Sequence, residues 1–191
     1  MSNSTTEELV VLVNEQNEVI GTTPKATVHG RETPLHRAFS CFIFNDEGEF
    51  LLQQRAFSKK TWPGIWSNSC CGHPSPDEKN VDAAKRRLEF ELGLTDFSYL
   101  REVAPYRYCF VRDGVMENEI CPIILVITNQ EPVLNPDEVE AVKWISWQDF
   151  VHDTVENPQN WSEWCVEETQ ILEKNSEFLA LKESLGIESL S

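Results

Sequence analysis

GHPSPDEKNVDAAKRRLEFELGL, residues 72–94, is the stretch of sequence that decides the fold. It predicts a loop, a helix over residues 77–92 and a second loop. Ser75 or Asp77 can cap the helix and Gly93 can end it, because such residues satisfy the free backbone groups at helix ends. The apolar positions fall on one helical face, namely Val81, Ala84, Leu88 and Leu92. A merely amphipathic surface helix explains that face but not the spacing of Gly72, Glu78 and Arg86.

Strand and turn patterns surround this helix on both sides. They predict paired strands in residues 7–23, a hairpin in 39–55, a long hairpin pair in 99–128 around Asp113-Gly114, a strand in 139–146, an acidic helical stretch in 147–156 and a final helix in 162–185. Residues 25–36 look like a loop. The order of elements predicts an α+β fold, a single compact domain with a mixed β-sheet flanked by helices.

The composition narrows the possible classes of protein. The 191 residues carry a net charge of −16, which argues against nucleic acid and anionic membranes as partners. From residue 131 onward there are fourteen acids and three bases, so we expect an anionic ligand to bind to the first two-thirds of the chain. No apolar run approaches the roughly 18 residues of a membrane span, and the N-terminus lacks the layout of a signal peptide. We therefore expect a cytoplasmic protein.

Six cysteines occur in the chain, several of them inside apolar runs. Disulfide frameworks are typical of short secreted proteins, so these cysteines are expected to be reduced thiols. Cys71 stands in the polar stretch SNSCCGHP and is the thiol most available for chemistry. Its neighbour Cys70 is expected to be a small buried residue.

Three histidines and two glutamates are candidates for a metal site: His29, His36, His73, Glu117 and Glu119. The two glutamates stand two positions apart in an apolar strand, so both point to one face. Imidazoles and carboxylates together suit a divalent transition metal. The simpler interpretation is that the histidines are scattered and the glutamates face water.

Residues 72–94 resemble the Nudix box, which binds a substrate diphosphate through magnesium. Arg87 and Phe90 stand where that pattern has glutamates, and Glu91 is the carboxylate that remains. A hydrolase needs several carboxylates there to hold metals and activate water. One magnesium bridging Glu91 to a diphosphate is compatible with the sequence, whereas ordinary attack by water is not.

From about Lys25 to Trp164 the chain resembles the type I isopentenyl-diphosphate isomerases, which have a Nudix fold. The matching segments run from His29 to Phe39, through RAFSKKTWPGIWSNSCCGHP and the degenerate box, to YRYCFVRDGVMENEICP. The resemblance implies a catalytic core over residues 25–164, an N-terminal extension with a strand pair over 1–24 and a C-terminal helix over 165–191. It also implies a small isoprenoid diphosphate substrate and a monomer.

The resemblance assigns roles to individual residues. His29, His36, His73, Glu117 and Glu119 match ligands of a Mn²⁺ or Zn²⁺ ion, and Glu91 matches the ligand of a Mg²⁺ on the diphosphate. Cys71 and Glu119 match proton-transfer groups, with Tyr108 beside that glutamate and Trp164 over the hydrocarbon. Basic residues near the diphosphate are matched by Lys25, Arg55, Lys59 and Arg87.

The chemistry of that reaction fits these residue types. Moving an unactivated double bond requires protonation of one carbon and deprotonation of another, with a tertiary carbocation between. An aromatic face stabilises a desolvated cation by about 2 kcal/mol or more, which suits Trp164. Two alternatives remain: a Nudix hydrolase of another diphosphate, and a non-catalytic metal-binding module with a closed coordination sphere. His152 matches nothing and is expected to be a surface histidine.

Overall fold

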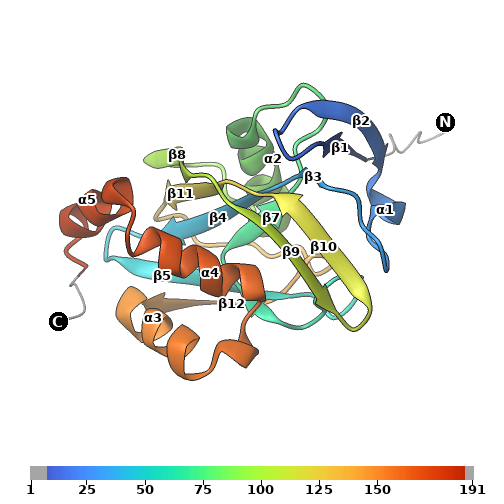
Figure 1. Ribbon diagram of the computed structural model, residues 1–191. Helices are drawn as coiled ribbons and strands as arrows, with labels where there is room; N and C mark the ends of the chain where they lie inside the picture. Colours follow the sequence, from blue (N-terminus) through green and yellow to red (C-terminus); the bar gives the residue numbers. More distant parts are fainter. Residues whose placement is uncertain (1–7, 188–191) are drawn as a thin grey trace, which may run out of the picture.

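The computed structural model describes residues 8–187, and their strands form two mixed sheets (Figure 1). The five-stranded sheet has the order β2 (Val19–Pro24), β1 (Leu9–Val13), β3 (His36–Arg37), β10 (Val115–Ile120) and β9 (Arg107–Arg112). The seven-stranded sheet has the order β12 (Val139–Ser146), β5 (Glu49–Arg55), β4 (Phe39–Phe44), β11 (Ile123–Ile127) and β8 (Tyr99–Ala104), with β6 (Trp66–Ser67) and β7 (Cys70–Gly72) on β5 and β4. The pairs β10·β3 and β11·β4 are parallel. The expected α+β class with mixed sheet and flanking helices is confirmed, with the strands divided between two sheets.

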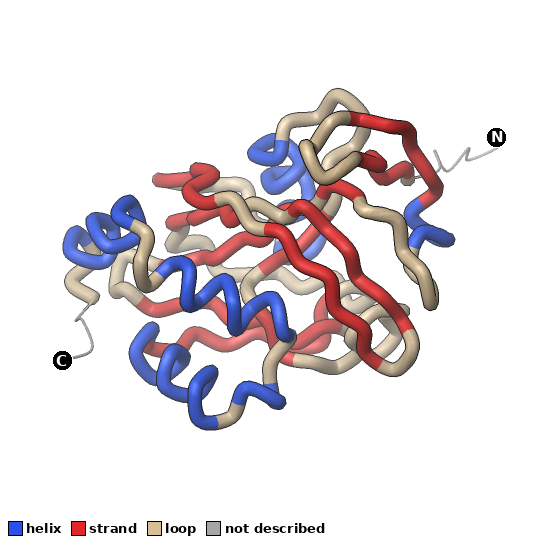
Figure 2. Tube along the Cα trace, in the orientation of Figure 1, coloured by secondary structure: helices blue, strands red, loops and turns tan. Residues whose placement is uncertain are grey.

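Helices cover both faces of the seven-stranded sheet (Figure 2). One face carries α2 (Asn80–Leu92), and the other carries α3 (Trp147–Glu156), α4 (Glu163–Leu172) and α5 (Ser176–Ser184), with the short η1 (Pro158–Asn160) between α3 and α4. The short α1 (Lys25–Val28) lies instead beside β1 and β2 of the five-stranded sheet. Strand β4 is buried throughout, and its side chains alternate between two apolar cores. Phe39, Cys41 and Ile43 pack in the core beneath α2, whereas Phe42 and Phe44 pack with residues of α3, α4 and α5. None of the helices within residues 8–187 is long and apolar enough to cross a membrane.

Helix α2 ends as the sequence predicts but begins later. Gly93 has φ +65°, and its N–H bonds to the carbonyl of Glu89, which closes the helix in the left-handed conformation that glycine adopts readily. The expected start at residue 77 is wrong, because Asp77 has φ +64° and the helix begins at Asn80 without a side-chain cap. The carboxylate of Glu78 accepts a hydrogen bond from the Ser75 N–H instead, so the loop and not a cap determines the start.

The final helix predicted over residues 162–185 is wrong, because the chain forms two helices there. The break lies at residues 173–175, where the Asn175 side chain accepts a hydrogen bond from the Phe178 N–H and caps α5. The predicted C-terminal helix over residues 165–191 starts inside α4. Its residues 188–191 lie outside the described residues, as do residues 1–7 of the expected N-terminal extension. The stretch 25–36 is not wholly a loop, since it opens with α1.

The long hairpin pair expected over residues 99–128 links the two sheets. Strands β8 and β11 pair in the seven-stranded sheet, and β9 and β10 pair in the five-stranded sheet. The change of sheet occurs near Pro105 and Pro122, where the Cys121 N–H donates to the Tyr106 carbonyl over 2.8 Å. Residues on β10 are thereby brought to face residues carried by the other sheet.

Candidate active site

A cavity of about 770 Å³ lies between the sheets and receives side chains from both. Most of the residues that the sequence nominates line it: Lys25, His29, Arg55, Lys59, Cys71, His73, Arg87, Tyr108, Glu117, Glu119 and Trp164. His36 and Glu91 lie behind this lining and are buried. His152 lies on α3 and is exposed, as expected.

Strand pairing brings the three histidines and two glutamates together. Glu119 on β10 is the register partner of His36 on the parallel strand β3, and Glu117 is on the same face of β10 two residues earlier. His29 and His73 come from the loops after α1 and β7. The centroids of the three imidazole rings lie 5.1–5.6 Å from one another, so the predicted cluster exists.

The donor atoms of this cluster suit a metal ion. The ligand atoms of His29, His36, His73 and Glu119 all lie within 4.8 Å of one another. His29 Nε2 is 2.9 Å from Glu117 Oε2, yet the geometry between them is not that of a hydrogen bond, and neither atom has a hydrogen-bond partner among residues 8–187. Buried polar atoms without partners are unusual in proteins. A set of imidazole nitrogens and carboxylate oxygens with unused lone pairs aimed at each other fits a divalent transition metal.

Glu119 divides its two carboxylate oxygens between two kinds of partner. Oε1 lies 3.1 Å from His36 Nε2 and 2.9 Å from His73 Nε2. Oε2 accepts a hydrogen bond of 2.6 Å from the Tyr108 hydroxyl. Burial alone would raise the pKa of Glu119, but the hydrogen bonds and charges of the two histidines outweigh it and hold the pKa well below its usual value. Burial lowers the pKa of His73 to about 4, against the opposing effect of Glu119.

Cys71 lies on β7 with its sulfur held by the Asn68 side chain. Asn68 Nδ2 is 3.2 Å and Oδ1 is 3.3 Å from Sγ, and the Ser40 hydroxyl is 3.5 Å away. Burial is the largest cause that raises the pKa of this thiol and the charge of Glu168 is the next, and together they bring it to about 12 against the hydrogen bonds of Ser40 and Asn68. Cys71 is therefore a neutral thiol at neutral pH, whereas Cys70 is fully buried on the side of α2.

The loop between β7 and α2 explains the spacing of Gly72, Glu78 and Arg86. A Cβ on Gly72 would come within 2.8 Å of both Arg87 Cγ and Phe39 Cζ, so only glycine fits between helix and sheet. Arg86 binds both carboxylate oxygens of Glu78 and donates to the His73 carbonyl over 3.2 Å. This fork fixes the backbone that carries His73 and, two residues before it, Cys71.

Aromatic rings form one wall of the cavity. Trp164 on α4 stacks on Tyr108 with centroids 5.8 Å apart, and it meets Trp62 edge-on at 5.2 Å. Its indole N–H donates to Asn68 Oδ1 over 3.1 Å, so one amide positions both the thiol and this ring. Trp161 instead packs on Phe150 in the core. Trp164, not Trp161, is the tryptophan that faces the site.

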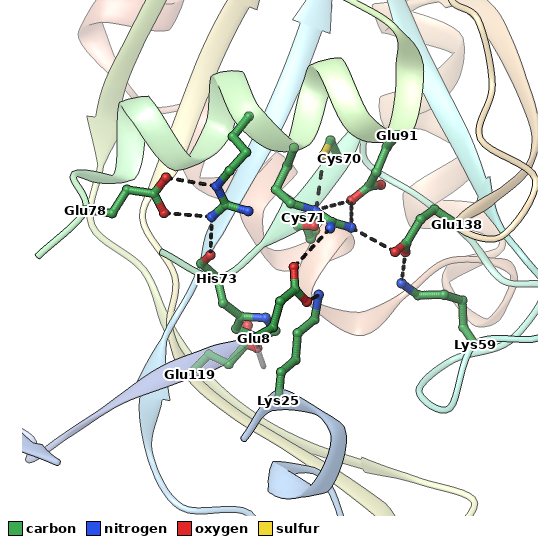
Figure 3. Close-up of polar contacts among 12 residues, drawn as sticks. Glu8, Lys25, Lys59, Cys70, Cys71, His73, Glu78, Glu91, Glu119 and Glu138 are labelled. Atoms are coloured by element: carbon green, nitrogen blue, oxygen red, sulfur yellow. Dashed lines mark hydrogen bonds and ion pairs between the residues drawn. The ribbon is translucent and has the colours of Figure 1, made fainter. Parts of the chain in front are cut away.

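Cations and acids alternate at the opposite end of the cavity (Figure 3). Lys25 pairs with Glu8 at 2.8 Å, and Lys59 pairs with Glu138. Arg87, only 4% exposed, lies 2.6 Å from Glu91 Oε1 and 3.1 Å from Glu138 Oε1. Lys25, Lys59 and Arg87 thus each have an acidic partner, whereas Arg55, which also lines the cavity, donates to the carbonyl and the hydroxyl of Thr61.

Glu91 faces Arg87 and not the cavity. Its second oxygen accepts a hydrogen bond of 3.0 Å from Gln53 Nε2, so both oxygens have partners. Arg87 also stacks its guanidinium over Phe90 at 4.9 Å. Of the two residues that replace carboxylates in the Nudix pattern, Arg87 thus pairs with the carboxylate that remains, and Phe90 stacks on that arginine.

Sequence reasoning missed three polar residues of the site. Asn68 and Ser40 are buried partners of the thiol, and Glu138 is the acid between Lys59 and Arg87. Ser40 carried a signal, since it interrupts the apolar run FSCFIF of a buried strand. Nothing local marks Glu138, because its partners come from other parts of the chain.

Comparison with known proteins gives consistent results. Residues 34–165 match the NUDIX domain family. The chain is 47% identical over 159 residues to the isopentenyl-diphosphate Delta-isomerase of Saccharopolyspora erythraea, covering 83% of this chain and 82% of that one. The isopentenyl-diphosphate Delta-isomerase of Kocuria rhizophila is 41% identical over 187 residues, covering 97% of this chain and all of the other.

Solved structures show the same fold at low sequence identity. A Deinococcus radiodurans protein superposes with a TM-score of 0.62 at 20% identity, covering 78% of this chain and 90% of the other. A MutT protein from Methanosarcina mazei superposes with a TM-score of 0.61 at 18% identity, covering 79% and 97%. These two likenesses concern the fold alone.

Proposed function

The chain belongs to the NUDIX domain family and, within it, to the isopentenyl-diphosphate Delta-isomerases, and from this premise we propose how its cavity performs the isomerisation. The enzyme interconverts isopentenyl and dimethylallyl diphosphate by protonation and deprotonation through a tertiary carbocation. The observation that carries the proposal is one cavity into which one sheet brings Cys71 and the other brings Glu119. Two proton-transfer groups on separate walls are what this reaction needs.

The walls between these two groups suit a carbocation. Tyr108 and Trp164 present stacked rings to the cavity, and a cation over an aromatic face is stabilised by about 2 kcal/mol or more when desolvated. The hydroxyl of Tyr108 bonds to Glu119 Oε2, which leaves Oε1 for the histidine cluster. Tyr108 can therefore help one oxygen handle a proton while the other serves the metal site.

The histidine cluster is proposed to hold Mn²⁺ or Zn²⁺ through His29, His36, His73, Glu117 and Glu119. Such a metal lowers the basicity of Glu119 and orients its carboxylate. The unsatisfied lone pairs on His29 and Glu117 support this assignment. Replacing His29 with alanine should remove the metal from the purified protein, measured by elemental analysis, while His152→Ala on the exposed face of α3 should retain it. Full metal content in His29→Ala would contradict the five-ligand site.

The basic end is proposed to bind the diphosphate through Lys25, Arg55, Lys59 and Arg87, with Mg²⁺ held by Glu91. Lys25 and Lys59 are paired with carboxylates here, so the diphosphate competes with Glu8 and Glu138 for them. Glu91 can take a magnesium only when Arg87 turns from it to another anion. Glu91→Gln should keep the transition metal and weaken the magnesium-dependent binding of the diphosphate.

Proton NMR of isopentenyl diphosphate with purified protein and Mg²⁺ tests the function directly. Signals of the dimethylallyl isomer should appear, and in heavy water the product should carry deuterium. Release of phosphate without isomerisation would instead favour a Nudix hydrolase. The open cavity beside Cys71 speaks against a metal-binding module with a closed coordination sphere.

The organisation of the protein follows from the same assignment. We infer a single domain with its catalytic core over residues 25–164, working as a monomer in the cytoplasm. All the residues proposed for the site lie within that core, and the thiol chemistry requires a reduced Cys71. Gel filtration with light scattering checks the monomer.

A further inference from the structure

Trp62 has a backbone conformation that bulky residues rarely adopt. Its φ is +47°, in the left-handed region, and Pro63 follows it. A proline disfavours helical conformations at the residue before it, and a positive φ is a genuine outlier at a large side chain. The other non-glycine residues with positive φ within residues 8–187 are asparagine or aspartate, which tolerate it. Strain of this kind concentrates at functional sites, yet the reaction as proposed gives Trp62 no role.

The side chain of Trp62 holds this conformation in place. It is 2% exposed, and its indole N–H donates to Glu163 Oε2 over 2.6 Å. The other oxygen of Glu163 accepts a hydrogen bond of 3.2 Å from Arg112 Nε, and the guanidinium carbon of Arg112 lies 5.9 Å from the centroid of the Trp62 ring. Arg112 ends β9 and Glu163 begins α4, so the indole joins its loop to two other elements. Glycine would adopt this φ without strain, so the side chain is what the position requires.

Trp62 packs against the tryptophan that faces the cavity. The rings of Trp62 and Trp164 meet edge-on with their centroids 5.2 Å apart. Trp164 lines the cavity and Trp62 does not, so Trp62 supports Trp164 from behind. Glu163 is the chain neighbour of Trp164, and therefore the hydrogen bond and the ring contact both act on the first turn of α4.

Thr61 extends this support to the basic end of the cavity. Its carbonyl accepts hydrogen bonds from Arg55 Nε over 3.2 Å and from Arg55 Nη2 over 2.9 Å, and its hydroxyl accepts a third from Nη2 over 2.9 Å. The guanidinium carbon of Arg55 lies 5.8 Å from the centroid of the Trp164 ring. Arg55, Thr61, Trp62 and Trp164 thus form a closed circle of contacts, in which two adjacent loop residues hold one arginine and one indole.

We propose that Trp62 is a positioning residue that determines substrate specificity, because it fixes the distance between Arg55 and Trp164. This inference rests on the proposed function, in which Arg55 binds the diphosphate and Trp164 lies over the hydrocarbon. The distance between those two side chains then sets how many carbons fit between the diphosphate and the double bond. Trp62 acts on the substrate through Trp164 and touches no substrate atom itself.

A homologue of isopentenyl diphosphate with one more methylene between the diphosphate and the double bond tests this proposal. The parent should prefer isopentenyl diphosphate in kcat/KM by about 10- to 200-fold, the range that one methylene contributes. Phenylalanine is smaller than tryptophan and has no N–H, so in Trp62→Phe the Trp164 ring can move away from Arg55. The preference should then fall by about tenfold, within that same range.

The ratio of the two kcat/KM values separates positioning from a structural role. Damage to the fold lowers both values alike and leaves their ratio unchanged, and an unchanged ratio in Trp62→Phe overturns the proposal. A parent that converts both substrates equally well also overturns it. If the parent converts none of the homologue, Trp62→Phe should convert it, and a variant that still converts none contradicts the proposal.

Trp66→Phe is the matched control, because it makes the same substitution four residues later. Trp66 lies on β6, and its ring packs against Lys143 with Nζ 4.7 Å from the centroid, outside the circle of contacts. It should keep the ratio of the parent. A ratio that falls equally in Trp66→Phe would show that any loosening of this segment changes specificity and would overturn the assignment to Trp62.

A second variant, Glu163→Ala, removes the hydrogen-bond acceptor and leaves both indole rings in place. Glu163 is about one-third exposed, so its loss leaves no buried gap. The preference for isopentenyl diphosphate should fall in this variant too. Adding Glu163→Ala to Trp62→Phe should change the ratio no further, because phenylalanine has no N–H to donate. Losses that multiply in the double variant would show that the two residues act separately and would overturn the proposal.

Conversion of isopentenyl diphosphate by the parent separates this proposal from the proposed function. A parent that converts neither substrate contradicts the proposed function itself. A parent that isomerises isopentenyl diphosphate, together with a Trp62→Phe variant that keeps the parent ratio, contradicts only the role of Trp62.

Discussion

Cys70 and Cys71 are adjacent in the chain but face different surroundings. Cys71 lines the cavity, and Cys70 is fully buried among residues beneath α2. We expect Cys71→Ala to reduce turnover by 10² or more, the typical size of a proton-transfer contribution, while diphosphate affinity stays near that of the parent. Cys70→Ala should instead cost about 1 kcal/mol of unfolding free energy through lost packing and retain activity. Steady-state kinetics and urea unfolding distinguish the two, and inactivation of Cys70→Ala alone would reverse the assignment.

Tyr108 acts through one atom, its hydroxyl. That oxygen is 2.6 Å from Glu119 Oε2, and burial raises the pKa of Tyr108 well above its usual value, so it donates its proton and does not ionise. Tyr108→Phe keeps the ring that stacks on Trp164 and removes the hydrogen bond. Turnover should fall about tenfold, less than the 10²- to 10⁴-fold that a proton-transfer group itself contributes, with little change in KM. A KM that rises while kcat stays constant would mean that the ring, and not the hydroxyl, matters.

At the scale of elements, the β9–β10 hairpin sets the register of the catalytic carboxylate. Its turn residues Asp113 and Gly114 have φ +52° and +77°, the conformation that a two-residue hairpin turn requires. The turn places Glu119 opposite Tyr108 and Glu117 opposite Phe110. Gly114→Val forces a branched side chain into a left-handed conformation and should cost about 1–2 kcal/mol, read from thermal unfolding.

Asp113→Asn is the control for that turn, because asparagine tolerates positive φ. It should unfold at the temperature of the parent. If Gly114→Val were as stable as the parent, the conformation of the turn would not be what holds the register of β9 and β10. Metal content would then show whether the substitution disturbs the histidine cluster.

At the scale of the molecule, acid should unfold the protein by neutralising paired carboxylates. Although burial raises it, the charges of Lys59 and Arg87 lower the pKa of Glu138 to about 2. Because the folded pKa lies below the ordinary value of 4.5, the unfolded chain takes up the proton first. The stability that ionised Glu138 contributes is present above pH 4.5 and is lost as the pH falls toward 2. At 1.36 kcal/mol per pKa unit its upper bound is about 3 kcal/mol, and solvent screening makes it smaller.

Urea unfolding between pH 7 and pH 3 measures that effect. The free energy of unfolding of Glu138→Gln should depend less on pH than that of the parent. Glu140→Gln changes an exposed acid two residues later, on β12, and should follow the parent curve. Parallel curves for the parent and Glu138→Gln would show that the ion pairs with Lys59 and Arg87 add no stability.

The sequence by itself determined the features that depend on neighbours along the chain. The apolar face of α2, its end at Gly93 and the turn at Asp113-Gly114 are local patterns of periodicity and backbone preference, and the structure contains all three. The histidines and glutamates of the cluster could be proposed from the sequence, because the spacing of the glutamates and the resemblance to the isomerase family both indicate them. The start of α2 and the break at Asn175 could not be predicted from local patterns, because side chains from the loops compete for the same backbone groups.

Only the tertiary structure decided which charges meet. The contacts of Arg87 with Glu91 and Glu138, the sharing of Glu119 between His73 and Tyr108, and the isolation of Glu168 all join or separate distant residues. The free energy of a charged group depends on its burial and on its partners in space. Neither quantity is encoded in a local pattern, so Glu168, which stands in an acidic stretch of the sequence, is fully buried in the fold.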